Sequence, residues 1–178
     1  METNKANYTK NSLQVRDIVQ VGLFSAIIFA ATTVIHIPYG NGGVIHLGDS
    51  MVFLAALLFG KKKAAFAGAI GMTLFDVLNG YVVWAPFTLV IKALMGYIAG
   101  SIAYSGNSKG ESLLRNSVGM VLGGLWMTAG YYIAEAIITG NVISPIIGVP
   151  GNLLQFGAGA VIALFISAAL KGTRYFNR

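Results

Sequence analysis

The apolar residues of this chain fall into six long runs separated by short polar stretches. The runs cover roughly residues 17–35, 47–60, 64–80, 84–104, 114–139 and 150–170. A helix needs about 20 predominantly apolar residues to cross a bilayer, with about 17–25 typical, so the pattern predicts membrane-spanning helices. The second run is short, and the fifth is long enough to tilt or to extend beyond the bilayer.

The composition agrees with this pattern. Of the 178 residues, 56% are hydrophobic and only 10% are charged, whereas a soluble domain has about a quarter charged residues. We therefore predict an all-α integral membrane protein, a six-transmembrane-helix bundle with residues 1–178 in a single domain. The expected location is multi-pass in a bacterial plasma membrane. The chain has no cysteine and two histidines, so we expect neither a metal nor a cofactor.

Basic residues alternate between the two ends of the predicted bundle. Eleven of the 12 Lys and Arg residues lie in the two tails or in the second-to-third and fourth-to-fifth connections. Because basic residues stay on the cytoplasmic side, this predicts six spans with both termini inside, in tails of about 1–16 and 171–178. Without the short second span, Lys61–Lys63 would lie on the wrong side. The net charge of +6 is thus explained by topology, and we expect contact with membrane lipid but not with nucleic acid.

Ionisable residues inside the apolar runs are the main functional signal. Asp49, Asp76, Lys92 and Glu135 each cost roughly 2.5–3.5 kcal/mol at a helix centre. All four lie in the outer half of the bundle, where helical spacing adds polar and aromatic neighbours. The predicted substrate-binding residues are His46, Asp49, Asp76, Asn79, Trp84, Lys92, Tyr131, Glu135, Asn152 and Gln155. The alternative is structural: Lys92 pairs with Asp76 or Glu135 and ties helices together, and the histidines are ordinary loop residues.

The outer connections are rich in Gly, Pro and Asn and also contain apolar and aromatic residues. They are predicted either to fold over a ligand or to form plain interfacial loops with an aromatic belt.

Small residues recur every four positions on the first helix, at Gly22, Ala26 and Ala30. Such a stripe lets another helix approach closely. The approaching helix belongs either to another protein or to the bundle itself. Gly68 and Met72, with Gly71 adjacent, form a weaker version on the third helix.

Sequence motifs for catalysis are absent. The chain contains no GxxxxGK[ST], HExxH or GxSxG motif, so we predict a non-enzymatic protein that does not itself hydrolyse ATP. A stand-alone transporter or channel for a small polar solute is an alternative, and it would need a polar path through the inner half. A membrane enzyme would be expected to carry its acidic residues near the cytoplasmic face.

The segment Gly42–Asp49 (GGVIHLGD), followed by an apolar helix and Lys61–Lys63, resembles the substrate-binding S components of energy-coupling factor (ECF) vitamin transporters. The resemblance covers essentially the whole chain. It implies that a vitamin-like ligand binds from outside beneath the first outer loop. It also implies that the first-helix stripe contacts a transmembrane T component and that two cytoplasmic ATPases power transport.

The resemblance also suggests the ligand. The sequence is most similar to members assigned to hydroxymethylpyrimidine or pyridoxine. An acid pair, one base, amides and aromatic residues suit a small, flat, polar heterocycle that stacks and forms hydrogen bonds on several edges. Pantothenate fits less well, because one lysine among three carboxylates is a poor site for an anion.

Overall fold

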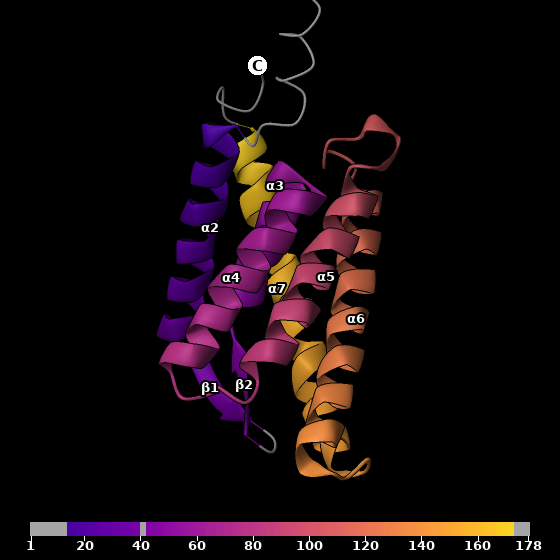
Figure 1. Ribbon diagram of the computed structural model, residues 1–178. Helices are drawn as coiled ribbons and strands as arrows, with labels where there is room; N and C mark the ends of the chain where they lie inside the picture. Colours follow the sequence, from indigo (N-terminus) through magenta and orange to yellow (C-terminus); the bar gives the residue numbers. More distant parts are fainter. Residues whose placement is uncertain (1–13, 40–41, 173–178) are drawn as a thin grey trace, which may run out of the picture.

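A computed structural model describes residues 14–39 and 42–172, which form six α-helices and one two-stranded hairpin (Figure 1). The elements are α2 (Val15–Val34), β1 (His36–Tyr39), β2 (Gly43–His46), α3 (Gly48–Phe59), α4 (Lys61–Leu78), α5 (Ala85–Ala103), η1 (Ser105–Asn107), α6 (Leu113–Thr139), η2 (Ser144–Ile147) and α7 (Gly148–Lys171). Each helix coincides with one predicted run to within a few residues. The predicted helical bundle is confirmed, and the proposed tails lie largely outside the described residues.

Four segments are long and apolar enough to cross a membrane: Val15–Val34, Ala85–Ala103, Leu113–Thr139 and Ser144–Lys171. Helix α4 has 18 residues and begins with three lysines. Helix α3 has only 12 residues, and ten of them are buried. At 1.5 Å per residue it is about 18 Å long, much less than the ~30 Å hydrocarbon core. Hydropathy predicts α3 only weakly as a membrane span, because it is a short central helix. The count of six spans stays a prediction.

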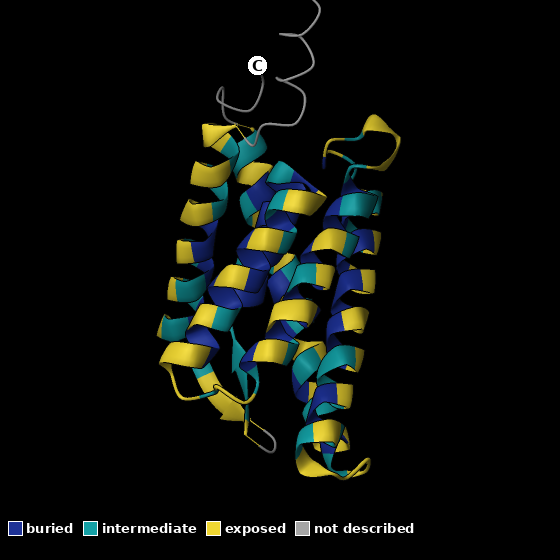
Figure 2. Ribbon diagram, in the orientation of Figure 1, coloured by how far each residue is buried: buried dark blue, intermediate teal, exposed yellow. Residues whose placement is uncertain are grey.

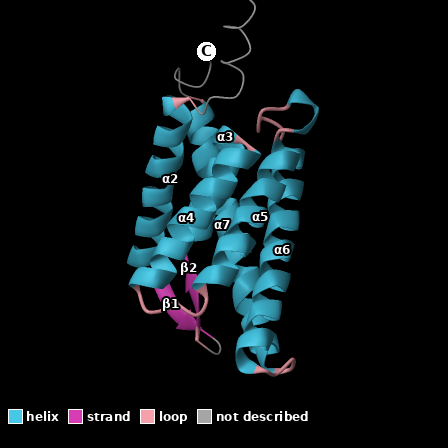
Figure 3. Ribbon diagram, viewed as in Figure 1, coloured by secondary structure: helices cyan, strands magenta, loops and turns pink. Residues whose placement is uncertain are grey.

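The helices form two layers. Helices α2, α4, α5 and α6 lie side by side in that order and form one layer. Helices α3 and α7 pack behind them (Figure 1). The hairpin, the α4–α5 loop and η2 lie at one end of the bundle, whereas the α3–α4 turn and η1 lie at the other (Figure 3). The basic residues Arg16, Lys61–Lys63, Lys109 and Lys171 therefore gather at the end opposite the hairpin.

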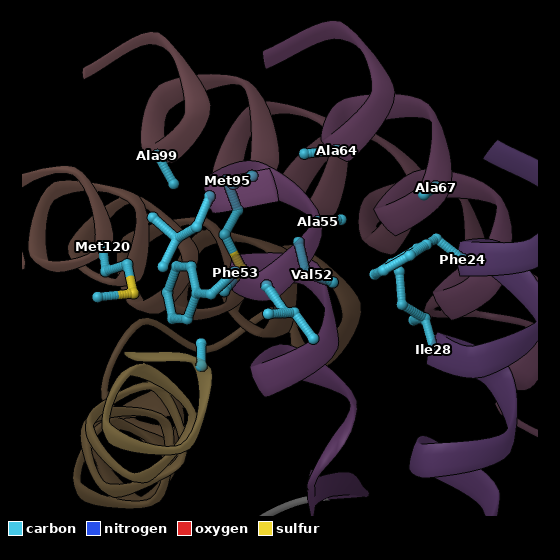
Figure 4. Close-up of a cluster of buried hydrophobic side chains, with 14 of the residues drawn as sticks. Phe24, Ile28, Val52, Phe53, Ala55, Ala64, Ala67, Met95, Ala99 and Met120 are labelled. Carbon is cyan, nitrogen blue, oxygen red and sulfur yellow. The ribbon is translucent and has the colours of Figure 1, made fainter. Parts of the chain in front are cut away.

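The apolar core surrounds α3. Val52 and Phe53 are fully buried and pack among Met95 of α5, Met120 of α6 and Ile28 of α2 (Figure 4). Large apolar side chains also cover the outward faces of the helices, as the exposed positions in Figure 2 show. Phe165, for example, is 74% exposed. Lipid, unlike water, accepts such a surface, since its chains are as apolar as these side chains.

The two stripes of small residues have different surroundings. A Cβ on Gly71 would lie 2.6 Å from the Ser25 carbonyl oxygen of α2, so Gly71 packs within the bundle. Gly22, Ala26 and Ala30 are all exposed, and a Cβ on Gly22 would meet no atom within 4 Å. The first-helix stripe therefore does not serve packing among the described helices.

Candidate functional site

A cavity opens at the hairpin end of the bundle, between the hairpin and helices α4 to α7. Its empty space is about 630 Å³, counting the open solvent at its mouth. Seven of the ten residues predicted to bind substrate line it: His46, Asp76, Trp84, Tyr131, Glu135, Asn152 and Gln155. These residues come from five separate segments, which are β2, α4, the α4–α5 loop, α6 and α7. Their contact with a ligand stays a prediction.

The hairpin covers the cavity. Its strands pair antiparallel, with His36 opposite His46 and Tyr39 opposite Gly43, and five of its residues line the cavity wall. The Tyr39 ring lies against the start of α7, since a Cβ on Gly151 would lie 2.4 Å from Tyr39 Cε1. The sequence analysis missed this hairpin, because four-residue strands in a Gly- and Pro-containing loop give no readable periodicity. It therefore also missed Tyr39, Val44 and Ile45 as lining residues.

Aromatic side chains form one wall of the cavity. The rings of Trp84 and Tyr131 lie 6.1 Å apart at 55°. Tyr81 stacks on Phe75 with ring centroids 5.8 Å apart. The Tyr131 hydroxyl donates to Thr88 Oγ1 at 3.2 Å. Thr88, which the sequence analysis did not select, is buried and lines the cavity beside Trp84.

Lys92 and Asp49 lie beneath the cavity and do not line it. They form an ion pair, and both side chains are 0% exposed. Lys92 Nζ also contacts Met127 Sδ at 3.0 Å and lies 5.2 Å from the centroid of the Tyr131 ring. The structural alternative correctly predicted that Lys92 forms an ion pair between helices. Its partner in the pair, however, is Asp49 of α3 rather than Asp76 or Glu135. The pair joins α3 to α5.

Gln155 connects this ion pair to the hairpin. Its Nε2 donates to Asp49 Oδ2 at 2.6 Å, and its Oε1 accepts from the backbone N–H of His46 at 3.0 Å. Both ends of the amide are thereby committed to protein groups. A side chain at the cavity wall thus holds strand β2 against the buried pair.

The remaining acidic groups face the cavity. Asp76 is 6% exposed and Glu135 7%, and they lie on α4 and α6. No Lys or Arg occurs among the cavity-lining residues that the structure describes. Because Asp49 neutralises Lys92, the cavity is acidic, whereas the sequence suggested a site of mixed charge.

His46 contributes a neutral ring. Burial lowers its pKa to about 4, and the nearby Asp49 carboxylate only partly offsets this. The ring is therefore neutral at physiological pH and offers one donor and one acceptor nitrogen. Within residues 14–39 and 42–172, Nδ1 is buried without a hydrogen-bond partner.

Asn79 lies outside the cavity. It is the residue after the last turn of α4, and its Nδ2 donates back to the Phe75 carbonyl at 3.0 Å. Helical spacing placed it on the face of Asp76, but the helix ends at Leu78 and Asn79 is exposed. In the described part of the chain, no three His, Asp or Glu side chains gather closely enough to hold a metal ion.

Comparison with known proteins identifies the family. Residues 12–172 match the family described as ECF-type riboflavin transporter, S component. The chain belongs to this family of ECF transporter S components. Members of the family are transport subunits rather than enzymes. They bind a small vitamin-like substrate and associate with a T component and ATPases.

Two curated relatives and one solved structure are similar to this S component. The thiamine precursor transporter HmpT of Lactococcus lactis subsp. cremoris (strain MG1363) is 30% identical over 141 residues, 79% of this chain and 78% of the relative. An uncharacterized protein of Pyrococcus woesei is 39% identical over 114 residues, 64% of this chain and 74% of the relative. The structure of the S component of a bacterial ECF transporter matches with a TM-score of 0.65 at 18% identity. That match covers 88% of this chain and 96% of the other, and it shows the fold.

Proposed function

We propose that this S component captures a small, flat, polar vitamin precursor from outside the cell, with hydroxymethylpyrimidine or pyridoxine favoured, and delivers it through an ATP-driven partner module. The observation that carries the proposal is the cavity beneath the hairpin, with its two carboxyl groups, aromatic wall and amides. The similarity to a thiamine precursor transporter supports a pyrimidine.

The direction of capture is inferred from charge. Helix α4 begins with three lysines and α7 ends at Lys171. These residues lie at the end of the bundle opposite the cavity. Because basic residues favour the cytoplasmic side, the cavity would face outward in a bacterial plasma membrane. A stand-alone transporter would need a polar path through the bundle. Below the Lys92–Asp49 pair, however, the core around Phe53 is apolar, which favours a binding subunit that relies on a T component and two ATPases.

Riboflavin is the second candidate ligand, because the matching family is described as a riboflavin transporter. The pyrimidine-dione edge of a flavin presents two carbonyl oxygens on either side of one N–H. Asp76 and Glu135 can only accept hydrogen bonds when ionised. An acidic cavity is therefore better suited to a ring that carries hydrogen-bond donors.

Ligand binding can be followed by intrinsic fluorescence, because the chain has two tryptophans and only Trp84 lines the cavity. We expect hydroxymethylpyrimidine or pyridoxine to quench the fluorescence of the detergent-purified protein at lower concentration than riboflavin. Trp126→Phe should keep the quenching and Trp84→Phe should lose it. Absence of binding across a broad vitamin panel would refute the proposed function.

The first-helix stripe provides a test of partner binding. Gly22→Leu is expected to leave the melting temperature of the isolated protein unchanged, since no atom lies within 4 Å of the added Cβ. It should abolish co-purification with a T component and ATPases, because the larger side chain keeps a partner helix from approaching closely. Gly157→Leu is the matched control, since Gly157 of α7 has equally open surroundings. Normal co-purification of Gly22→Leu would show that the stripe is not the interface.

A further inference from the structure

One oxygen of Asp76, a residue that lines the cavity, lacks a hydrogen-bond partner among the described residues. Asp76 is 6% exposed, and its Oδ2 is buried without a hydrogen-bond partner among the residues that the structure describes. A buried carboxylate oxygen without a donor is costly. Since Asp76 lines the cavity, a bound molecule can supply the missing donor.

Asp76 accepts a hydrogen bond at the end of a short chain of hydroxyl groups. The Tyr131 hydroxyl donates to Thr88 Oγ1 at 3.2 Å. Thr88 accepts this hydrogen bond and donates its own hydroxyl hydrogen to the Asp76 carboxylate. A hydroxyl has one hydrogen, so this chain of contacts runs in one direction, from Tyr131 through Thr88 to Asp76. The oxygen that remains can receive a hydrogen from a ligand in the cavity.

No protein cation takes that position. Lys92, the only lysine near the cavity among the described residues, is paired with Asp49. The amide of Gln155, which could otherwise donate, is committed to Asp49 at 2.6 Å. Among the described residues, no positively charged side chain donates a hydrogen bond to the free Asp76 oxygen.

We propose that Asp76 determines the ligand class, selecting nitrogen heterocycles that carry an exocyclic amino group next to a ring nitrogen. This inference rests on the proposed function and deepens it, because, of the two favoured ligands, only hydroxymethylpyrimidine carries such an amino group. The amino group donates to Asp76 Oδ2, and the ring lies among Trp84, Tyr131 and Tyr81. An oxo group at the same ring position would place a second acceptor against the carboxylate. A site built around a hydrogen bond rejects such an analogue strongly, because its own polar group stays unpaired.

The test compares hydroxymethylpyrimidine, which carries a 4-amino group, with its 4-oxo counterpart and with the compound lacking a 4-substituent. The wild-type protein should bind the amino compound roughly 10- to 100-fold more tightly than either analogue, as expected for a hydrogen bond to a charged group. Asp76→Asn can present an N–H in place of an acceptor. It should weaken binding of the amino compound and improve binding of the oxo compound relative to it, so that the selectivity ratio falls about tenfold or more.

Glu111→Gln is the matched control, because it removes the same charge from an exposed residue at the opposite end of the bundle. It should leave the selectivity ratio unchanged. A purely structural role for Asp76 would weaken all three compounds equally and keep the ratio. If Asp76→Asn does not purify as a monodisperse protein, the three compounds on the wild-type protein decide the matter.

The outcomes separate the inference from the proposed function. Equal binding of amino and oxo compounds, or an unchanged ratio in Asp76→Asn, would overturn the role of Asp76 and leave the transport function standing. Binding of riboflavin but not of the amino compound would do the same. Failure to bind any vitamin or precursor would remove both.

Discussion

Lys92→Met is expected to lower the free energy of unfolding by about 3–5 kcal/mol, because it leaves the Asp49 carboxylate buried without its counter-ion. Both side chains are 0% exposed in the wild-type protein. Asp49 would keep only the Gln155 amide at 2.6 Å. The measurement is the thermal unfolding midpoint of the purified protein in detergent, together with its yield as a monodisperse species.

The second substitution of the pair should rescue much of this loss. In Lys92→Met/Asp49→Asn no charge is buried, and the new amide oxygen can still accept from Gln155. Replacing both members of a buried ion pair is often close to neutral, whereas removing one is not. We therefore expect the double variant to be more stable than Lys92→Met, with a coupling energy that a double-mutant cycle measures.

Lys62→Met is the control, because Lys62 is an exposed lysine at the other end of the bundle. It should melt as the wild type does. If Lys92→Met also melted as the wild type but lost ligand binding, Lys92 would be a ligand contact rather than half of a structural pair.

Gly96→Ala is expected to destabilise the protein by about 1–3 kcal/mol, the usual cost of forcing an extra carbon into a packed interface. Its Cβ would lie 2.7 Å from the Ala64 carbonyl oxygen and 2.8 Å from the Ala64 carbonyl carbon. These are backbone atoms of α4 and cannot rotate away, so α4 and α5 must separate. Lys92 and Thr88 lie about one and two turns away on α5, and Asp76 lies on α4, so ligand affinity should fall as well.

Gly157→Ala makes the same chemical change in α7, where no atom lies within 4 Å of the added carbon. Because glycine inside a helix costs about 0.5–1 kcal/mol relative to alanine, this variant should be neutral or slightly more stable. The thermal midpoint should thus fall for Gly96→Ala and stay unchanged or rise slightly for Gly157→Ala. Equal midpoints for the two would mean that α4 and α5 are not in backbone contact at Gly96.

The sequence predicted the helices well, since a run of apolar residues long enough for a bilayer has few other solutions. The fourth run, 84–104, became α5 at Ala85–Ala103. The short second run became α3, whose 12 residues are shielded from lipid by the surrounding helices. Length and hydropathy alone could not distinguish a short buried helix from a weak span.

The candidate site was predicted less completely. Helical spacing told us that Asp76 and Lys92 occupy the polar faces of their helices, and the cost of burying them in a membrane told us that these faces point inward. Spacing within one helix does not reveal which face of another helix it meets. Lys92 and Asp49 are 43 residues apart in the chain, and only the packing of α3 against α5 makes them a pair.

The sequence by itself therefore determined the helical runs, the gathering of basic residues at one end and the concentration of polar residues at the other. These follow from the solvent that each residue tolerates, which is a property of the residue and its place along the chain. The tertiary structure decided that Lys92 pairs with Asp49 and that Asp76 and Glu135 line the cavity. With Lys92 paired to Asp49 and Gln155 bound to both Asp49 and the hairpin, the cavity keeps Asp76 and Glu135. Its acidic character depends on helix rotation and close packing, which short-range sequence patterns do not encode.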